Sequence, residues 1–237
     1  VDMPRELVNH TCVNGYNPLL VAAYRGHRET IEALAKNGAS VLFFNQYGET
    51  PLFLAAKNGH VGAINALVNI AGRQIRNLYF EGAAARRNSN WIHKKCLGYL
   101  TRANKNGESP IHIAAINGHD KAITALVRYG HCLYLTKDGE TPLYLAAKMG
   151  HVNAIKALVN SGADVDIGIK RSTPPRHVAE GFTVFNECYA DKETPMYIAA
   201  KNGHIDAIRT LVSYRADVNA ARKDGATPMH AAAQNGH

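Results

Sequence analysis

One phrase of sequence recurs along this chain, and its spacing limits the possible folds more than any other feature. In residues 50–60 the phrase reads Thr-Pro-Leu-Phe-Leu-Ala-Ala-Lys-Asn-Gly-His. Related copies begin at Asn17, Ser109, Thr141, Thr194 and Thr227. The steps from Pro18 to Pro51 and from Pro195 to Pro228 are equal and set the period. Self-similarity at a fixed period of this size is the signature of a repeat protein, in which small structural units stack side by side.

The chemistry of each copy predicts a pair of short helices. Thr50 can cap a helix with its hydroxyl, and Pro51 suits the first helical turn, where no amide donor is needed. Gly59 can end that helix in a left-handed conformation. A second phrase, Ala-Ile-x-Ala-Leu-Val, then places apolar residues at helical spacing in residues 63–68. We therefore expect all-α units of two antiparallel helices and a projecting finger loop, each stabilised by its neighbours.

These signatures resemble those of the ankyrin family: Thr-Pro-Leu-x-x-Ala-Ala, Gly-His and the Gly-Ala-Asp-Val-Asp of residues 162–166. The resemblance covers nearly the whole chain and implies an ankyrin-repeat solenoid of helix-turn-helix units with finger loops. It implies protein binding through the finger tips and the exposed face of the first helices, in the concave groove of the stack. It also implies a structural role, hydrogen bonding to backbone between repeats, for the recurring histidines His60, His119, His151 and His204.

We interpret the whole chain, residues 1–237, as a single repeat array. The interval from Pro51 to Pro110 falls somewhat short of two periods, which predicts a degenerate third repeat between them. The chain stops at His237, after the first helix of a last repeat, so we expect that repeat to be cut short and the natural protein to continue. The expected units are about 15–44, 45–76, 77–103 (degenerate), 104–135, 136–166, 191–221 and 222–237 (truncated), with an insert at 167–190.

The insert at residues 167–190 makes one finger loop much longer than the next finger. Pro174 and Pro175 indicate a turn, and residues 182–185, Phe-Thr-Val-Phe, are typical of a strand. We therefore expect an extended hairpin. Long loops on regular scaffolds often carry function, so the insert is expected to form part of a binding site. A tolerated surface insertion without function is the alternative.

No motif of a known catalytic site is present. The chain has no P-loop, no Gly-x-Ser-x-Gly and no His-Glu-x-x-His. Cys188 and His177 could be imagined as a thiol–imidazole pair, but both lie in the insert without a third residue to orient them. The four cysteines show no Cys-x-x-Cys spacing and are expected to be reduced thiols. We expect no catalytic residues, no metal and no cofactor, and hence not an enzyme.

The two positions between the paired alanines and Gly-His are expected to lie on the binding surface. Four of the copies carry a cation there: Arg25, Lys57, Lys148 and Lys201. Finger loops add further cations, and aromatic residues near the same surface could anchor a partner. The residues expected to bind a partner are Arg25, Tyr47, Lys57, Arg86, Arg87, Lys105, Lys137, Tyr144, Lys148, Arg176, Phe182, Phe185, Tyr197, Lys201 and Lys223.

The net charge of +8 favours an acidic partner, and with this scaffold an acidic protein is the leading hypothesis. One alternative is a targeting module for a larger enzyme whose catalytic domain lies C-terminal to this segment. A second is nucleic-acid binding through the basic stripe, although no nucleic-acid motif accompanies the charge. We expect a monomeric, cytoplasmic protein without a membrane span. Irregular arrays of this kind also resemble ankyrin-bearing effectors of intracellular bacteria, which would imply the host cytosol.

Overall fold

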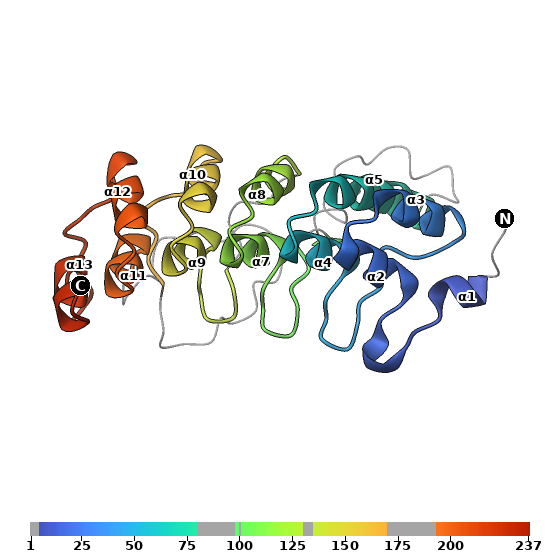
Figure 1. Cartoon of the computed structure of the whole chain (residues 1–237), viewed down its shortest axis with the longest axis horizontal. Coiled ribbons are helices and arrows are strands. Elements are labelled where there is room, and N and C mark those ends of the chain that lie inside the picture. Colours follow the sequence, from blue (N-terminus) through green and yellow to red (C-terminus); the bar gives the residue numbers. More distant parts are fainter. Residues whose placement is uncertain (1–4, 80–97, 100, 130–134, 170–192) are drawn as a thin grey trace.

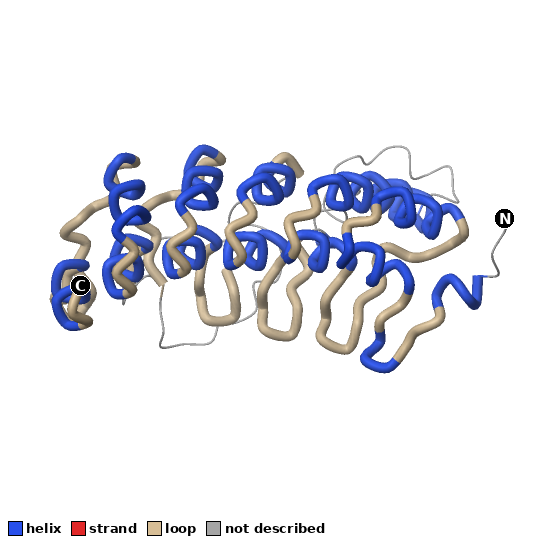
Figure 2. The backbone as a smooth tube through the Cα atoms, viewed as in Figure 1, coloured by secondary structure: helices blue, strands red, loops and turns tan. Residues whose placement is uncertain are grey.

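The computed structural model describes residues 5–79, 98–99, 101–129, 135–169 and 193–237, which form an elongated stack of helix pairs (Figure 1). The inner row holds the first helix of each unit: α2 (Pro18–Arg25), α4 (Pro51–Lys57), α7 (Pro110–Ile116), α9 (Pro142–Lys148), α11 (Pro195–Lys201) and α13 (Pro228–Gln234). The outer row holds α3 (Arg28–Lys36), α5 (Val61–Tyr79), α8 (Asp120–Val127), α10 (Val152–Asn160) and α12 (Ile205–Ser213). A short helix α1 (Arg5–Asn9) and a 3-10 turn η1 (Val13–Gly15) precede them. Loops project from the inner row as fingers (Figure 2), so the expected all-α solenoid is confirmed.

The inner helices begin as their sequence predicts. The hydroxyl of Thr50 accepts a hydrogen bond from the backbone N–H of Phe53 at 3.1 Å, and Pro51 occupies the first turn. The same cap starts α9 at Thr141 and α11 at Thr194, while the amide oxygen of Asn17 starts α2. Each cap satisfies an amide that has no partner within its own helix, so these short helices are fixed at their first residue.

A glycine and a histidine join each unit to the next. Nε2 of His60 lies 3.0 Å from the carbonyl oxygen of Tyr24, and the imidazole donates because a carbonyl only accepts. A Cβ on Gly26, whose φ is +75°, would lie 2.5 Å from the same imidazole ring. His119, His151 and His204 make the same bond at 2.9–3.0 Å. The contact recurs at Gly59–His119, Gly118–His151, Gly150–His204 and Gly203–His237, which confirms the structural role expected for these histidines.

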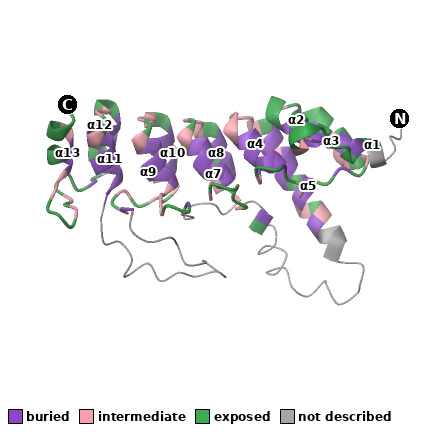
Figure 3. Cartoon of the chain, turned by 90° about the horizontal axis from the view of Figure 1, so that it is seen from below, coloured by how far each residue is buried: buried purple, intermediate pink, exposed green. Residues whose placement is uncertain are grey.

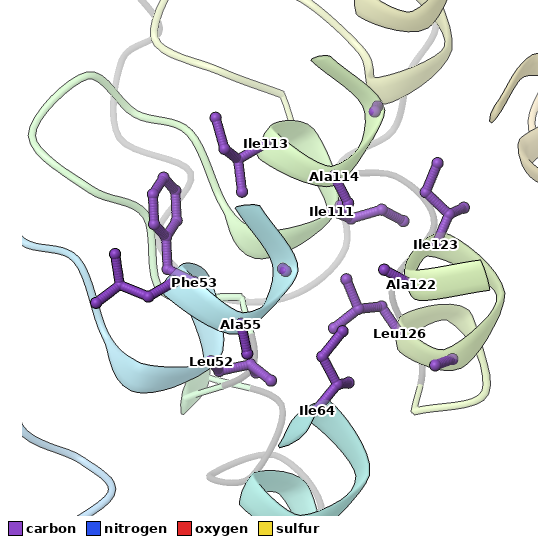
Figure 4. Close-up of a cluster of buried hydrophobic side chains, with 14 of the residues drawn as sticks. Leu52, Phe53, Ala55, Ile64, Ile111, Ile113, Ala114, Ala122, Ile123 and Leu126 are labelled. Atoms are coloured by element: carbon purple, nitrogen blue, oxygen red, sulfur yellow. The ribbon is translucent and has the colours of Figure 1, made fainter. Parts of the chain in front are cut away.

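The core lies between the two rows and between successive units (Figure 3). Leu52 of α4 and Ile111 of α7 are both fully buried, and Figure 4 shows them facing Ile64 of α5 and Leu126 of α8. The paired alanines Ala55 and Ala56 are buried as well, and their small side chains let neighbouring inner helices approach closely. Each unit therefore completes its core only with the unit beside it.

The degenerate third repeat predicted at residues 77–103 is wrong as a stacked unit, because the units on either side of it contact each other. α4 packs directly against α7, and α5 packs directly against α8. The carbonyl oxygen of Lys57 accepts from Nε2 of His119 at 3.0 Å and from Nδ2 of Asn117 at 2.9 Å, which is the junction found between adjacent units elsewhere. The described stack thus holds five helix pairs followed by α13. The interval from Pro51 to Pro110 is one period plus an insertion, not two shortened periods.

Part of that insertion lengthens an outer helix. α5 has 19 residues, whereas α3, α10 and α12 have nine each. Residues 80–97 of the predicted degenerate repeat lie outside the described residues. Tyr99, which follows the insertion, is buried in the stack. Burial raises the pKa of its hydroxyl above the ordinary value for tyrosine. The chain therefore rejoins the regular pattern just before the next finger.

The long insert also has a defined attachment point. In regular fingers a backbone N–H at one side of the base donates to a carbonyl oxygen at the other, from Asn45 to Glu49 at 3.1 Å and from Thr136 to Glu140 at 3.0 Å. The equivalent bond here runs from Ile169 to Glu193 at 3.1 Å. Residues 170–192 therefore take the place of an ordinary finger tip such as 137–139. The hairpin expected within the insert lies outside the described residues.

Among the described residues, no helix combines the length and the apolar character needed to cross a bilayer.

Replacing Leu158 by Ala should lower the free energy of unfolding by about 2–5 kcal/mol, because this α10 side chain is only 2% exposed between two units. Urea denaturation followed by circular dichroism measures the change. Lys156→Ala, at an exposed position of the same helix, is the control and should stay within about 0.5 kcal/mol. Equal stability of the two variants would show that the core is misplaced.

Candidate functional site

The four predicted stripe cations occupy matching places on the inner row. Lys57, Lys148 and Lys201 each lie in the last turn of α4, α9 and α11, and Arg25 lies in the last turn of α2. Positive charge at these C-terminal ends is favourable to the helix dipole. We call the surface formed by these helix ends and the adjoining fingers the inner face. The inner helices lie side by side in Figure 1, so the inner face runs along the whole stack.

Two of these cations are already paired with carboxylates of their own unit. Nζ of Lys57 lies 3.3 Å from Oε1 of Glu49, and Nζ of Lys148 lies 3.0 Å from Oε1 of Glu140. Both glutamates stand at the base of a finger, just before the helix cap, and their side chains are mostly buried. In the structure they neutralise two stripe positions directly.

Glu49 has further partners that hold it in place. Nδ2 of Asn45 donates to its Oε2 at 2.8 Å, and the hydroxyl of Tyr16 donates to the same oxygen at 3.1 Å. Burial, and then the nearby charge of Glu49, raise the pKa of Tyr16 to about 12. The phenol therefore stays protonated and remains a donor, which links the first finger to the second.

Glu193 stands in the same place but has different partners. Its Oε2 accepts from the hydroxyl of Tyr144 at 3.1 Å, and its Oε1 accepts from Nη1 of Arg222 at 3.0 Å. Arg222 comes from the next finger, lies 5.4 Å above the ring of Tyr197, and its pKa is raised by a hydrogen bond to the Tyr197 hydroxyl. At the position that Asn45 occupies in the finger of Glu49, the finger of Glu193 has Ile169, whose side chain has no donor. Donors from neighbouring units take the place of the missing side-chain amide.

Two of the predicted aromatic anchors are corrected by the structure. Tyr144 is 0% exposed and Tyr197 only 4% exposed, so neither ring is available to a partner. Phe53, which occupies the same helical position in α4, is buried too. The third residue of the inner helix faces the neighbouring unit, and the hydroxyls of the tyrosines are used inside the stack. The alternation of aromatic and aliphatic residues in the phrase gave no sign of this.

The finger residues of the prediction lie at the surface. Tyr47 is 49% exposed, and Lys105, Lys137 and Lys223 are exposed at the tips of three fingers. Nζ of Lys137 donates to the backbone carbonyl of Lys105, so these two tips contact each other. The remaining predicted binding residues lie outside the described part of the chain: Arg86, Arg87, Arg176, Phe182 and Phe185.

The list of residues expected to bind a partner left out other exposed apolar side chains of this region. Tyr24 and Met149 share the stripe positions with the cations and are nearly half exposed, and Phe44 is similarly exposed just before its finger. The guanidinium of Arg102 lies 3.8 Å from the ring centroid of Phe44. Their positions between the paired alanines and Gly-His, or next to a finger, could have identified them. They add apolar contact area to a face that charge alone had defined.

Ser109, the residue that precedes α7, and His112 of that helix resemble a catalytic pair but form the cap of the helix. Oγ of Ser109 lies 2.7 Å from Nδ1 of His112, and the backbone N–H of Ser109 also donates to that nitrogen. Both residues are buried, so no substrate could reach them. The described residues contain no cluster of three or more His, Cys, Asp or Glu side chains that could hold a metal ion. Cys188 and His177 lie outside the described residues.

Comparison with known families gives a match along nearly the whole chain. A family model described as ankyrin repeats matches in three copies, at residues 3–77, 82–169 and 177–237.

The similar curated proteins are much longer than this chain. The protein named "Probable E3 ubiquitin-protein ligase XBOS32", from Oryza sativa subsp. japonica, is 25% identical over 224 residues, 93% of this chain and 35% of that protein. The Caenorhabditis elegans homologue of transient receptor potential cation channel subfamily A member 1 is 30% identical over 129 residues, 54% of this chain and 9% of the channel. E3 ubiquitin-protein ligase XBAT33 from Arabidopsis thaliana is 29% identical over 118 residues, 49% of this chain and 18% of the ligase. The chain thus spans about a third or less of these relatives.

Tyr144→Phe should lower the free energy of unfolding by about 1–3 kcal/mol, because it removes a donor from the buried carboxylate of Glu193. Tyr47→Phe removes a hydroxyl from an exposed ring and should have almost no effect. Equilibrium urea unfolding of both variants makes the comparison. A Tyr144→Phe protein as stable as Tyr47→Phe would mean that this hydroxyl contributes nothing to the stack.

Proposed function

The chain belongs to the ankyrin repeat family, and from that premise we propose that it binds an acidic surface of another protein through the inner face and the fingers. The ankyrin array is a protein-interaction module. In this proposal the insert at residues 167–190 forms part of the site.

The observation that carries the proposal is the repetition of a cation at one place on the inner row. Arg25, Lys57, Lys148 and Lys201 end four helices of the inner row, α2 and α4 on one side of α7 and α9 and α11 on the other (Figure 1). The caps and the Gly–His contacts hold these helix ends in fixed positions, so little entropy is lost when a partner docks. A standard interface buries roughly 800 Å² on each partner, an area that a few adjacent units can supply.

The fingers extend the same surface. Lys105, Lys137 and Lys223 are exposed at finger tips, and Tyr47 and Phe44 add aromatic surface beside them. The insert supports the proposal by its attachment point, because Ile169 and Glu193 fix its two ends where an ordinary finger tip would lie. Pairing of Lys57 and Lys148 with glutamates lowers the charge of the stripe, so the surface suits a protein better than a polyanion such as nucleic acid.

A second candidate function is that of a targeting module in a larger enzyme. The observation that favours it is that two of the relatives are named as E3 ubiquitin-protein ligases and that this chain matches only 35% and 18% of their length. In such an arrangement the array would bind the protein that an attached domain acts on. This candidate uses the same inner face and differs only in what is joined to it.

Reversing two stripe charges tests the acidic partner. The chain carrying Lys148→Glu and Lys201→Glu should capture its partner more slowly at low salt, and the deficit should shrink as salt screens the charges. Partners are first isolated with the unchanged chain and association rates are then measured by biolayer interferometry at two salt concentrations. The control carries Lys121→Glu and Lys156→Glu, which make the same change of net charge on exposed positions of the outer helices α8 and α10. Equal rates for the two double variants would place the binding site elsewhere.

Shortening the long finger tests the insert. Residues 170–192 are replaced by Lys-Asp-Gly, the tip found at residues 137–139 and again at 223–225. Because the Ile169–Glu193 bond closes the stem in both forms, the stack should keep its helix content and its unfolding midpoint. The affinity for the partner should fall. Unchanged affinity in a folded variant would show that the insert is only tolerated.

A further inference from the structure

The three stripe lysines are not equivalent, and this allows the proposed function to be made more specific. Resting on that function, we propose that Lys201 is the position at which the inner face takes up a carboxylate of its acidic partner, with the apolar side chain of Met149 beside it. Lys57 and Lys148, by contrast, are occupied by carboxylates of the chain itself. The partner segment that fits is one in which an acidic side chain adjoins an apolar one.

The occupied lysines are held by glutamates that cannot easily turn away. The side chains of Glu49 and Glu140 are only 10% and 16% exposed, and each lies within 3.3 Å of its lysine. Glu49 is also fixed by Asn45 and Tyr16. A carboxylate from a partner would have to share these ammonium groups with an anion that is already in place. Such positions contribute little net attraction.

Lys201 is not paired with the glutamate of its own finger, because that glutamate has other partners. Glu193, at the place where Glu49 and Glu140 hold a lysine, is 3% exposed and has one oxygen on Tyr144 and the other on Arg222. The planar guanidinium of Arg222 fits a carboxylate well and also bonds to Tyr197, so it is a strong competitor for Glu193. Within the described part of the chain, Lys201 makes no ion pair. It ends α11 as a partly exposed cation that is not paired with a carboxylate of the described residues.

The neighbouring unit has an exposed apolar side chain at the end of α9, the helix that packs against α11. Nδ2 of Asn202 donates to the carbonyl oxygen of Lys148 at 2.8 Å, and Nε2 of His204 donates to the same oxygen at 3.0 Å. The ends of α9 and α11 are therefore in contact, and Met149, which follows Lys148, is 47% exposed beside them. A flexible thioether adapts to side chains of several shapes. Arg25, at the opposite end of the stack, cannot share the same carboxylate (Figure 1).

A short fluorescein-labelled peptide of glutamate and leucine, with a matched peptide in which glutamine replaces glutamate, tests the assignment by fluorescence anisotropy at low salt. Lys201→Gln should weaken binding of the glutamate peptide about two- to fivefold, the range of an exposed ion pair. The chain carrying Glu140→Gln with Lys148→Gln keeps its net charge and should bind like the unchanged chain, as should Glu49→Gln with Lys57→Gln. Glu140→Gln alone frees Lys148 and should strengthen binding. Lys156→Gln, on the outer helix α10, controls for the loss of one charge.

The outcomes separate this inference from the function on which it rests. If Lys201→Gln weakens binding and the two paired double variants do not, the inference holds. If a paired double variant weakens binding and Lys201→Gln does not, the inference is overturned while an acidic partner on the inner face is retained. If no inner-face variant differs from Lys156→Gln, or if the glutamate and glutamine peptides bind alike, both the inference and the acidic partner are overturned. Thermal unfolding of every variant confirms that the stack is intact.

Discussion

The stack depends on the contact between a glycine that has no side chain and the histidine ring of the next unit. At Gly118 and His151 a Cβ would lie 2.8 Å from the imidazole, closer than real Cβ contacts allow, and the glycine has a φ of +73° that other residues adopt poorly. The ring uses the space to reach the carbonyl oxygen of Ile116, just before the glycine. One glycine thus allows both the turn between the helices of a unit and the close approach of the histidine of the next unit. This contact therefore helps to set the spacing between neighbouring inner helices.

The sequence was sufficient to predict those parts of the molecule that a local rule determines. Thr50 caps α4 and Pro51 starts it because both effects act within one turn of helix. The histidine bonds were expected from the resemblance and are present. The third repeat was wrong because a period constrains only regular units, and the insertion between Pro51 and Pro110 approaches one period in length. The two interpretations, two shortened periods or one period plus an insertion, differ in whether α4 and α7 contact each other. This is a long-range contact that spacing alone does not encode.

The positions of the candidate site residues could be predicted from the sequence, but their charge pairing and side-chain directions could not. Counting along the repeats located Lys57, Lys148 and Lys201 at equivalent helix ends correctly. It could not show that two of these charges are matched by buried carboxylates, because that depends on where the finger base folds back over the helix. Nor could it show that Tyr144 points into the stack, since an aromatic residue in so short a helix has no periodicity long enough to assign its face. Charge pairing and side-chain direction are properties of neighbouring units together.

The stem of the fingers has a wider consequence. The same backbone bond closes the short tip 137–139 at Thr136–Glu140 and the much longer segment 170–192 at Ile169–Glu193. The entropy of closing a loop rises only slowly with its length, so the longer segment costs about 2 kcal/mol more than the short one. α9 and α11 still pack against each other across this unit, so the difference is absorbed outside the helices. A finger tip is consequently a site at which segments of unrelated length and composition can be exchanged during evolution, or inserted by design. The packing of the helices next to it does not change.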